Sequence, residues 1–514
     1  MSIDTSKTNR HERKLFLILF LVTVLSFLYF CTNIFGAPVD IDMYYIIRNG
    51  QDMLKYGIQH ENIWSYIPGQ KIIIQQWLYC IIMGGMYKTF GGCGIYAIAC
   101  ITMTLFVLSS VWFFREIGFG GYSAIVVTGI SYIAFNYNGV RPELLTCMLV
   151  TLQCAAVERY LNTKHKRWLY VMPLTVLAEI NLHGALWPIH FIMFIPYLLF
   201  LPEKLKKYFP KIKNRNVCIK DSVIPVILSV TALFINPYGV DGITYIIKSS
   251  KALEDYGKMI SELNATSLTV SAIPFIILIW FIVILVMSED YDLQSFFIIA
   301  GITLLMFLKV RNLGFIFPML FYNIYETEKV WHNRTEGKVH ILKKGFLRLG
   351  CILLGICIFF FIIVGYALRA RSIMLSFTNP SDAIVSPVKA VKWIEKNDSR
   401  KSESISILCD HNDGPYLEFK GYKVSSDSRP EIWTKAINGK HDIKEDLLCL
   451  MYPMQYYEKR NYPELYSKLI KKYKADYVCS DAFNSLFDYM MIENPDYELV
   501  VKGKGYTLFR YTGN

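Results

Sequence analysis

The segment QQWLYCIIMGGMYKTFGG, at residues 75–92, decides the topology of this chain, because it is apolar enough to enter a bilayer and carries a single charge, Lys88. If it crossed the membrane, the basic stretch ERYLNTKHKRW at residues 158–168 would lie outside, against the preference of lysine and arginine for cytoplasmic loops. If it lies flat in the outer interface as an amphipathic helix, the basic loops all fall on the cytoplasmic side. We therefore predict an interfacial helix at residues 75–92.

The rest of the chain contains many apolar blocks of about 15 to 22 residues, the length that a membrane-spanning helix needs. Of its 514 residues, 53% are hydrophobic and 15% are aromatic. The net charge of +12 comes from lysines and arginines in short loops between these blocks, so orientation in the bilayer explains it and we expect no nucleic-acid partner. The first block, at residues 15–30, follows a basic tail and precedes many others. We therefore predict a retained span with a cytoplasmic N-terminus, not a signal peptide.

These features predict an α-helical polytopic membrane protein with about eleven transmembrane helices, and with interfacial helices in a first outer loop at residues 36–94. Near residue 381 the composition becomes that of a soluble domain. This change predicts a transmembrane domain at 1–380 and an extracytoplasmic α/β domain at 381–514, with strands at 404–410 and 475–481 and helices at 387–397 and 462–474. The expected location is the plasma (inner) membrane. The predicted spans are 15–35, 95–114, 120–136, 143–159, 168–181, 185–201, 221–235, 268–288, 292–309, 312–326 and 345–367.

Polar groups recur at the predicted outer ends of these spans. The first outer loop contains PVDIDMYYIIRNGQDML at residues 38–54, and shorter loops contain NGVRPEL at 138–144, NLHG at 181–184, NPYG at 236–239 and VRN at 310–312. Charged groups at bilayer depth are costly and usually face a cavity or a partner. Their recurrence at one level predicts a site, with these candidate residues: Asp40, Asp42, Tyr45, Arg141, His183, Glu262 and Arg311.

The acidic pair has more than one interpretation. Asp40 and Asp42 are suited to bind a hard divalent cation or to supply a general base. They also suit an ordinary acidic loop at the end of a span, or a cap in which Asp42 begins the helix expected at residues 43–57. Tyr44 and Tyr45 fit an interfacial aromatic belt as well as a site. The sequence leaves the presence of a metal open.

The cationic candidates are also ambiguous when taken singly. Arg141 suits either an anchor at the lipid head groups or a forked contact with a phosphate. His183 is either a structural histidine or a ligand, and Arg311 either snorkels to the interface or binds an anion. Together with the acids, they suit a reaction in which a base deprotonates a hydroxyl while cations stabilise a departing phosphate. Activated nucleotides are scarce outside the membrane, so the expected donor is a lipid-linked phosphate sugar.

The ordered motifs resemble the GT-C superfamily of membrane glycosyltransferases, and most of all a group of bacterial multi-spanning proteins within it. That group has a D-x-D-x-W-W motif in the first loop, a helix ending in glycine and an H-E-W segment. Here these are matched by DIDMYYIIRNG and QQW. The segments RPELLT, NLHG, NPYG and VRN also match, as does SDSRPEIW at residues 426–433. In two departures, tyrosines replace the tryptophans, and Gln75 and Gln76 replace the histidine and glutamate, which removes a potential ligand or base.

The resemblance implies a glycosyltransferase that uses polyprenyl-phosphate-linked sugars at the outer face, with Asp42 or Asp40 as the acidic catalytic residue and Arg141 near the donor phosphate. We predict inverting transfer of a hexosyl or pentosyl group from polyprenyl phosphate to an envelope glycan, lipid or protein, with Asp42 as the base. One alternative is a transporter or flippase for lipid-linked glycans, which predicts ionisable residues along a path through the bilayer. Another is a non-catalytic assembly protein for envelope glycans.

Overall fold

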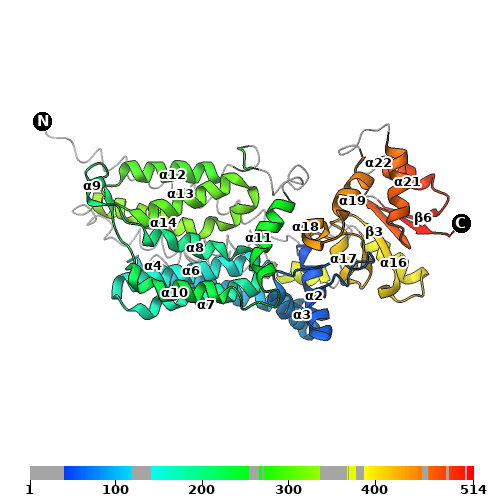
Figure 1. Cartoon of the computed structure of the whole chain (residues 1–514), viewed down its shortest axis with the longest axis horizontal. Helices are drawn as coiled ribbons and strands as arrows, with labels where there is room; N and C mark the ends of the chain where they lie inside the picture. Colours follow the sequence, from blue (N-terminus) through cyan, green and yellow to red (C-terminus); the bar gives the residue numbers. More distant parts are fainter. Residues whose placement is uncertain are drawn as a thin grey trace.

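A bundle of helices and a smaller α/β domain at one end of it make up the computed structural model of the chain (Figure 1). The α/β domain packs against α2 (Asp42–Tyr56) and α11 (Val240–Ala252), which lie at that end of the bundle. The structure describes residues 40–118, 140–253, 265–268, 271, 273–335, 367–368, 370–377, 387–453, 461–481, 485–503 and 506–513.

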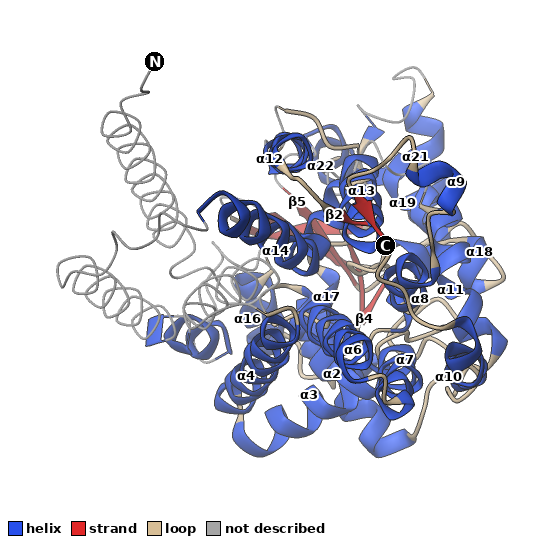
Figure 2. Cartoon of the chain, turned by 90° about the vertical axis from the view of Figure 1, so that its left-hand side faces the viewer, coloured by secondary structure: helices blue, strands red, loops and turns tan. Residues whose placement is uncertain are grey.

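The bundle helices run along the long axis of the molecule, and Figure 2 shows many of them nearly end-on. Among the described residues, α4 and α6 are long and apolar enough to cross a membrane by length and composition. The others are shorter, more polar or broken, as where Pro225 lies inside α10. The bundle consists of α4 (Gly92–Glu116), α6 (Glu143–Thr163), α7 (Val171–Leu182), α8 (Pro188–Phe194), α10 (Ile219–Ala232), α12 (Ile273–Met287), α13 (Leu293–Leu308) and α14 (Ile316–Thr335).

Each predicted span whose residues are largely described contains one of these helices. The span predicted at 185–201 is divided into short pieces, since α8 is flanked by 3-10 turns at Gly184–Leu186 and Ile195–Leu198. The predicted spans at 15–35 and 120–136 lie outside the described residues, and so does that at 345–367 apart from residue 367. The total of eleven spans therefore stays a prediction.

Two of the loops predicted to be cytoplasmic, at residues 159–167 and 204–220, lie at the end of the bundle away from the α/β domain, where α9 (Glu203–Lys206) is found (Figure 1). Their basic residues have acidic partners there. Arg159 Nη1 lies 3.2 Å from Glu116 Oε1, and Arg215 Nη1 lies 2.7 Å from Glu158 Oε2. The clustering of these loops at one end fits the orientation predicted from charge, because cytoplasmic loops prefer lysine and arginine.

The first outer loop folds into two helices, α2 and α3 (Trp77–Phe90), so the helix predicted at 75–92 is observed with slightly shorter bounds. The two helices touch through Gly50 and Gly84. A Cβ atom on Gly84 would lie 2.5 Å from Gln51 N and 2.8 Å from Gly50 Cα, and one on Gly50 would lie 1.7 Å from the carbonyl oxygen of Cys80. No larger residue fits at this crossing unless the backbones move apart.

The first prediction concerns this crossing. Gly84→Ala should push α3 away from α2 and lower the apparent melting temperature in detergent, because overpacking costs about 1–3 kcal/mol. The adjacent Gly85→Ala is the matched control. Its Cβ would meet Leu54 Cδ1 at an ordinary 3.6 Å, and alanine favours a helix over glycine. Equal melting temperatures for the two variants would contradict the close packing of α2 on α3.

The α/β domain has a five-stranded sheet in the order β4-β3-β5-β7-β6. β3 is parallel to β4 and β5, whereas β7 is antiparallel to β5 and β6. The strands and helices predicted in this part of the chain are confirmed as β3, β5, α16 and α21. The main elements are β3 (Ser406–Cys409), β4 (Lys423–Val424), β5 (Tyr477–Asp481), β6 (Tyr497–Lys502), β7 (Tyr506–Tyr511), α16 (Val388–Asn397), α17 (Gly414–Phe419), α18 (Lys435–Asn438), α19 (Ile443–Met451), α21 (Tyr462–Lys472) and α22 (Ser485–Ile492).

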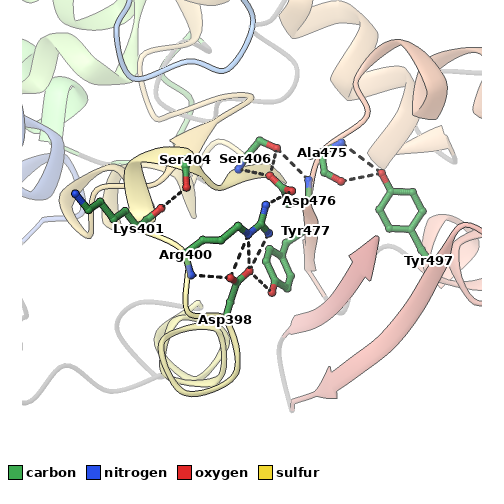
Figure 3. A network of polar contacts seen from close by, with 9 residues as sticks. All are labelled: Asp398, Arg400, Lys401, Ser404, Ser406, Ala475, Asp476, Tyr477 and Tyr497. Atoms are coloured by element: carbon green, nitrogen blue, oxygen red, sulfur yellow. Dashed lines mark hydrogen bonds and ion pairs between the residues drawn. The ribbon is translucent and has the colours of Figure 1, made fainter. Parts of the chain in front are cut away.

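A polar network fixes the start of β3 and β5 (Figure 3). Arg400 binds Asp398 with Nη2 at 2.8 Å and Asp476 with Nη1 at 2.7 Å. Asp476 Oδ2 in turn accepts from the backbone N–H of Ser406 at 2.8 Å, and Tyr477 OH donates to Asp398 Oδ2 at 2.9 Å. This network lies at the amino ends of the parallel strands β3 and β5.

The edge strand β4 joins the first outer loop. The N–H of Val424, at the end of β4, donates to the carbonyl of Trp64 at 2.9 Å, and Ser65 forms a parallel bridge with Val424. Tyr66 OH also donates to the carbonyl of Tyr473 at 3.0 Å. The chain that leaves β4 therefore emerges beside the first outer loop, close to the start of α2.

Candidate functional site

Asp40, Asp42 and Arg141 meet where the first outer loop touches the start of α6. Arg141 Nη2 lies 2.6 Å from Asp40 Oδ2 and 3.5 Å from Asp42 Oδ2, and Arg141 Nε donates to Asp40 Oδ2 at 2.9 Å. Each side chain is between 23% and 30% exposed. Two acids and a cation from distant parts of the sequence thus form one partly open cluster, as the sequence predicts for these three residues.

Asp42 begins α2 but does not cap it. The N-cap position is Ile41, and no side chain caps the helix from that position. Asp40 Oδ1 accepts from the backbone N–H of Asp42 at 2.9 Å, so the interpretation of Asp42 as the helix cap is wrong and Asp40 satisfies this donor instead. Asp40 therefore binds the helix start with one oxygen and Arg141 with the other.

A loop from the α/β domain reaches the same cluster. The Ser428 hydroxyl donates to Asp42 Oδ1, although the two residues are 386 positions apart. The next residue, Arg429, is buried and donates from Nε to Asp427 Oδ2 at 3.0 Å and from Nη2 to Glu418 Oε2 at 3.4 Å. The loop that carries Ser428 is therefore held by a buried group of charges within its own domain.

Burial and neighbouring charges shift the pKa values of this buried group in opposite directions. Burial, and then the charge of Asp427, hold the pKa of the Glu418 carboxyl well above its usual range against the pull of Arg429. Burial also opposes ionisation of Asp427, but the charge and hydrogen bonds of Arg429 outweigh it and lower the pKa of that carboxyl. Asp427 and Arg429 thus form the buried ion pair, and Glu418 is the neutral acid beside it.

The second prediction concerns this neutral acid. A raised folded-state pKa means that the contribution of Glu418 to stability is complete below its unfolded pKa of about 4.3 and is lost as the pH rises toward the folded value. Glu418→Gln removes this dependence. Its stability relative to the natural protein should therefore increase with pH, by up to about 1.4 kcal/mol per pH unit.

Thermal unfolding in detergent, between about pH 4.5 and about pH 7.5, measures this difference. Glu395→Gln is the matched control, because Glu395 is half exposed on α16 and not buried. Its Oε1 lies 3.7 Å from Lys420 Nζ. A difference between Glu418→Gln and the natural protein that stays constant over this pH range would contradict a raised pKa for Glu418.

Gln75, Gln76 and Tyr45 connect the first outer loop to its surroundings. Gln76 Nε2 donates to Tyr45 OH at 2.9 Å, and Gln75 Oε1 accepts from the N–H of Ala185, next to the NLHG motif, at 2.8 Å. Tyr45 is 5% exposed, and the Arg429 guanidinium lies 4.3 Å from the centre of its ring, in a cation–π contact. The two glutamines that depart from the family pattern therefore have structural partners here.

His183 lies inside the bundle, 3% exposed. Its Nδ1 is 2.9 Å from Thr146 Oγ1, which donates to Glu179 Oε1 at 2.6 Å, and Glu179 Oε2 lies 3.4 Å from His190 Nε2. Thr146 is in the first turn of α6, so His183 contacts the start of the helix that follows Arg141. The hydrogen bonds described for His183 link it to this network on α6, α7 and α8.

Several residues of these two networks are not among the candidates from the sequence, including Glu179, His190, Glu418, Ser428 and Arg429. The spacing of Glu179 and His183, four residues apart on one helix face, was the available indication of the first network. SDSRPEIW was noted as a motif of the terminal domain, but nothing in the sequence connects it to Asp42. Glu179 and His190 are ionisable groups within α7 and α8, inside the spans predicted at 168–181 and 185–201.

The other two candidate residues are Glu262 and Arg311. Glu262 lies outside the described residues, and so does the side chain of Arg311. The backbone of Arg311 belongs to a 3-10 turn at Val310–Phe315. This turn approaches α6, because Cys147 Sγ donates to the carbonyl of Gly314 at 3.4 Å. The VRN motif therefore lies beside the helix that begins at the Arg141 cluster.

The donors of the acidic pair do not fit a hard divalent cation. Such a cation takes six or more oxygen ligands, or keeps several waters beside one or two carboxylates. Here the Arg141 guanidinium lies against both carboxylates. Within the described ranges, no three His, Cys, Asp or Glu side chains are gathered so that they could hold a metal ion. The sequence-based hypothesis of a cation at Asp40 and Asp42 thus finds no supporting ligand set here.

Comparison with known proteins gives matches in structure. No protein-family model and no curated protein sequence matches the chain. The oligosaccharyltransferase AglB of Archaeoglobus fulgidus, solved with an inhibitory peptide and a dolichol-phosphate, aligns over 87% of this chain with a TM-score of 0.52 and 11% identity. This chain spans 66% of the length of AglB. ArnT of Cupriavidus metallidurans, bound to undecaprenyl phosphate, aligns over 96% of this chain and 97% of its own with a TM-score of 0.46 and 11% identity.

At 11% identity the likeness to AglB reports on the fold alone. It agrees with the resemblance drawn from the DIDMYYIIRNG, RPELLT, NLHG and NPYG motifs. The chain therefore shares the fold of the oligosaccharyltransferase AglB.

Proposed function

We propose that this chain is an integral-membrane glycosyltransferase that moves a sugar from a polyprenyl-phosphate donor to a hydroxyl of a cell-envelope acceptor at the outer face. One observation supports this function above the others. Asp40, Asp42 and Arg141 gather in a partly open cluster at the end of the bundle that bears the α/β domain, in a chain that shares the fold of AglB. A base and a phosphate-binding cation side by side are what such a transfer requires.

In the proposed reaction Asp42 is the general base. It takes the proton of the acceptor hydroxyl as that oxygen attacks the anomeric carbon of the sugar, and the bond from this carbon to the phosphate oxygen breaks. Attack from the face opposite the lipid phosphate inverts the anomeric centre. Arg141 stabilises the charge on the departing polyprenyl phosphate, and Asp40 orients Arg141 through their 2.6 Å and 2.9 Å contacts.

The other candidates have supporting roles in this proposal. Arg311 adds donors around the phosphate, and His183 supports the start of α6 behind Arg141 through its contact with Thr146. Glu262 contributes to substrate binding, and Tyr45 forms the wall behind Asp42. No step is assigned to a divalent cation, because the acidic pair is occupied by the guanidinium of Arg141.

The proposal includes a topology. Eleven spans, a cytoplasmic N-terminus, a first outer loop at residues 36–94 and an extracytoplasmic domain at 381–514 bring the cluster to the outer face of the plasma membrane. The clustering of basic loops at the opposite end supports this orientation. Accessibility of single cysteines on α11 and α9 to a membrane-impermeant reagent, in cells, tests it.

Transfer itself is tested with the purified chain in lipid nanodiscs, labelled polyprenyl-phosphate hexoses and pentoses, and an envelope extract as the acceptor source. Release of polyprenyl phosphate together with a labelled acceptor product is the expected result. If no labelled product forms with any donor, the glycosyltransferase assignment fails and the non-catalytic assembly role is favoured.

One observation favours transport of a lipid-linked glycan as a second candidate. Glu179, His183 and His190 are ionisable and buried within the bundle, where the transport hypothesis expects such groups. Reconstituted vesicles that carry a fluorescent polyprenyl-phosphate sugar distinguish the two functions. Movement of the lipid between leaflets without any transfer product would replace the transferase by a flippase.

A further inference from the structure

A loop of the α/β domain completes the acidic cluster, as its contact with Asp42 shows. The Ser428 hydroxyl donates to Asp42 Oδ1, while Asp42 Oδ2 lies 3.5 Å from Arg141 Nη2. One oxygen of this carboxylate is therefore directed by the α/β domain and the other by the start of α6. The proposed general base stands at a junction between the two parts of the molecule.

The loop that presents Ser428 has a fixed shape. Asp427 Oδ1 accepts from the N–H of Arg429 at 2.8 Å and from Trp433 Nε1 at 3.1 Å, and Asp427 Oδ2 accepts from Arg429 Nε at 3.0 Å. Asp427 and Trp433 are fully buried. Ser428 lies between two residues that are locked to each other, so its hydroxyl is presented to Asp42 from a rigid turn.

The same loop holds α2 from the side of Asp42. The Arg429 guanidinium lies 4.3 Å from the centre of the Tyr45 ring. With the Asn49 amide turned so that its donor and acceptor are both satisfied, the amide oxygen accepts from Arg429 Nη1 at 2.7 Å. Tyr45 and Asn49 follow Asp42 by three and seven residues, so all three lie along one face of α2. The α/β domain thus fixes both the carboxylate and the helix that carries it.

We propose that Ser428 is a positioning residue for sugar transfer: its hydroxyl holds the Asp42 carboxylate in the orientation in which it receives the acceptor's proton. The inference rests on the proposed transferase function. It adds that the α/β domain is a working part of the site, since docking of this domain brings Ser428 to Asp42. The activity of the cluster therefore depends on the position of the α/β domain.

The variant Ser428→Ala removes this donor, and Ser428→Thr retains it. Loss of a hydrogen bond to a carboxylate should lower kcat about tenfold or more and leave the KM for the polyprenyl-phosphate sugar within about twofold, because Arg141 is untouched. Ser428→Thr should recover most of kcat. Ser404→Ala is the matched control, since the Ser404 hydroxyl donates to the Lys401 carbonyl on the exposed side of the domain.

The pH profile of kcat gives a second measurement. Among the described residues, the charged and titratable groups that face Asp42 include Asp40, Arg141 and Tyr45, and none of these is altered in Ser428→Ala. The Ser428 hydroxyl donates to the ionised Asp42 carboxylate and so favours the ionised form. Its removal should shift the acidic limb of the kcat profile upward by about one pH unit. A variant that only loosened the fold would lose activity without this shift.

Hydrogen exchange of the peptide that covers residues 40–56 provides a measurement that needs no substrate. Faster exchange in Ser428→Ala than in the natural chain and in Ser428→Thr supports the positioning role. If the natural chain transfers no sugar, the proposed function fails and exchange alone decides. Unchanged kcat, pH profile and exchange in Ser428→Ala overturn the inference.

Discussion

Replacing Asp40 and Asp42 together by asparagine should slow sugar transfer by about a thousandfold, the range in which loss of a general base falls. The two asparagines keep the size of the side chains but remove the proton acceptor and the counter-charge of Arg141. The rate of labelled product formation in nanodiscs measures the loss. Binding of unlabelled polyprenyl phosphate, followed by thermal stabilisation, should weaken no more than in the single variant Asp40→Asn, because Arg141 is retained.

The single variants separate the two acids. Asp42→Asn should lower kcat with little change in the KM for the donor. Asp40→Asn should mainly raise that KM, because Asp40 holds Arg141 through Nε and Nη2. Asp241→Asn is the matched control, since Asp241 is 64% exposed on α11 and pairs with Lys248 at 2.6 Å. Full transfer by the double variant would remove Asp42 from the role of base.

The proximity of Asp40, Asp42 and Arg141 could be predicted because each residue lies at the outer end of a span that the sequence reveals. Apolar blocks give the spans, basic loops give their orientation, and orientation assigns the polar loops to one end of the bundle. Residues that share an end of a helical bundle are brought close by the short loops between its helices. The sequence did not indicate that Asp40 would take the helix N–H and leave Asp42 to the α/β domain.

The contact between Ser428 and Asp42 could not be predicted for a physical reason. Hydrophobic periodicity reports which face of an element is buried, but it does not report which domain covers it. The docking depends on single contacts, such as the backbone bond from Val424 to Trp64 and the stacking of Arg429 on Tyr45. The α11 helix is not predicted either, because the amphipathic segment that follows NPYG is too polar to be a span.

The buried charges around Arg429 should make the largest single contribution to the docking of the α/β domain. Arg429→Ala leaves Asp427 and Glu418 buried without their cation and removes the cation–π contact with Tyr45. Breaking a buried ion pair on one side costs about 3–5 kcal/mol. We expect a marked fall in the apparent melting temperature, together with faster hydrogen exchange of α2.

The control for this variant is Arg400→Ala, in the same domain. Arg400 binds two carboxylates as well, but its side chain is 46% exposed, so the loss should stay below about 1 kcal/mol. The melting temperature of Arg429→Lys should lie between those of Arg429→Ala and Arg400→Ala. Lysine keeps the positive charge but loses the planar guanidinium that donates to Asp427. Equal melting temperatures for Arg429→Ala and Arg400→Ala, with unchanged exchange of α2, would mean that the α/β domain does not hold α2 through Arg429. Docking of the domain would then depend on contacts outside the buried charges, such as the backbone contact of Val424 and the bond from Tyr245 OH to Glu431 Oε1 at 2.7 Å.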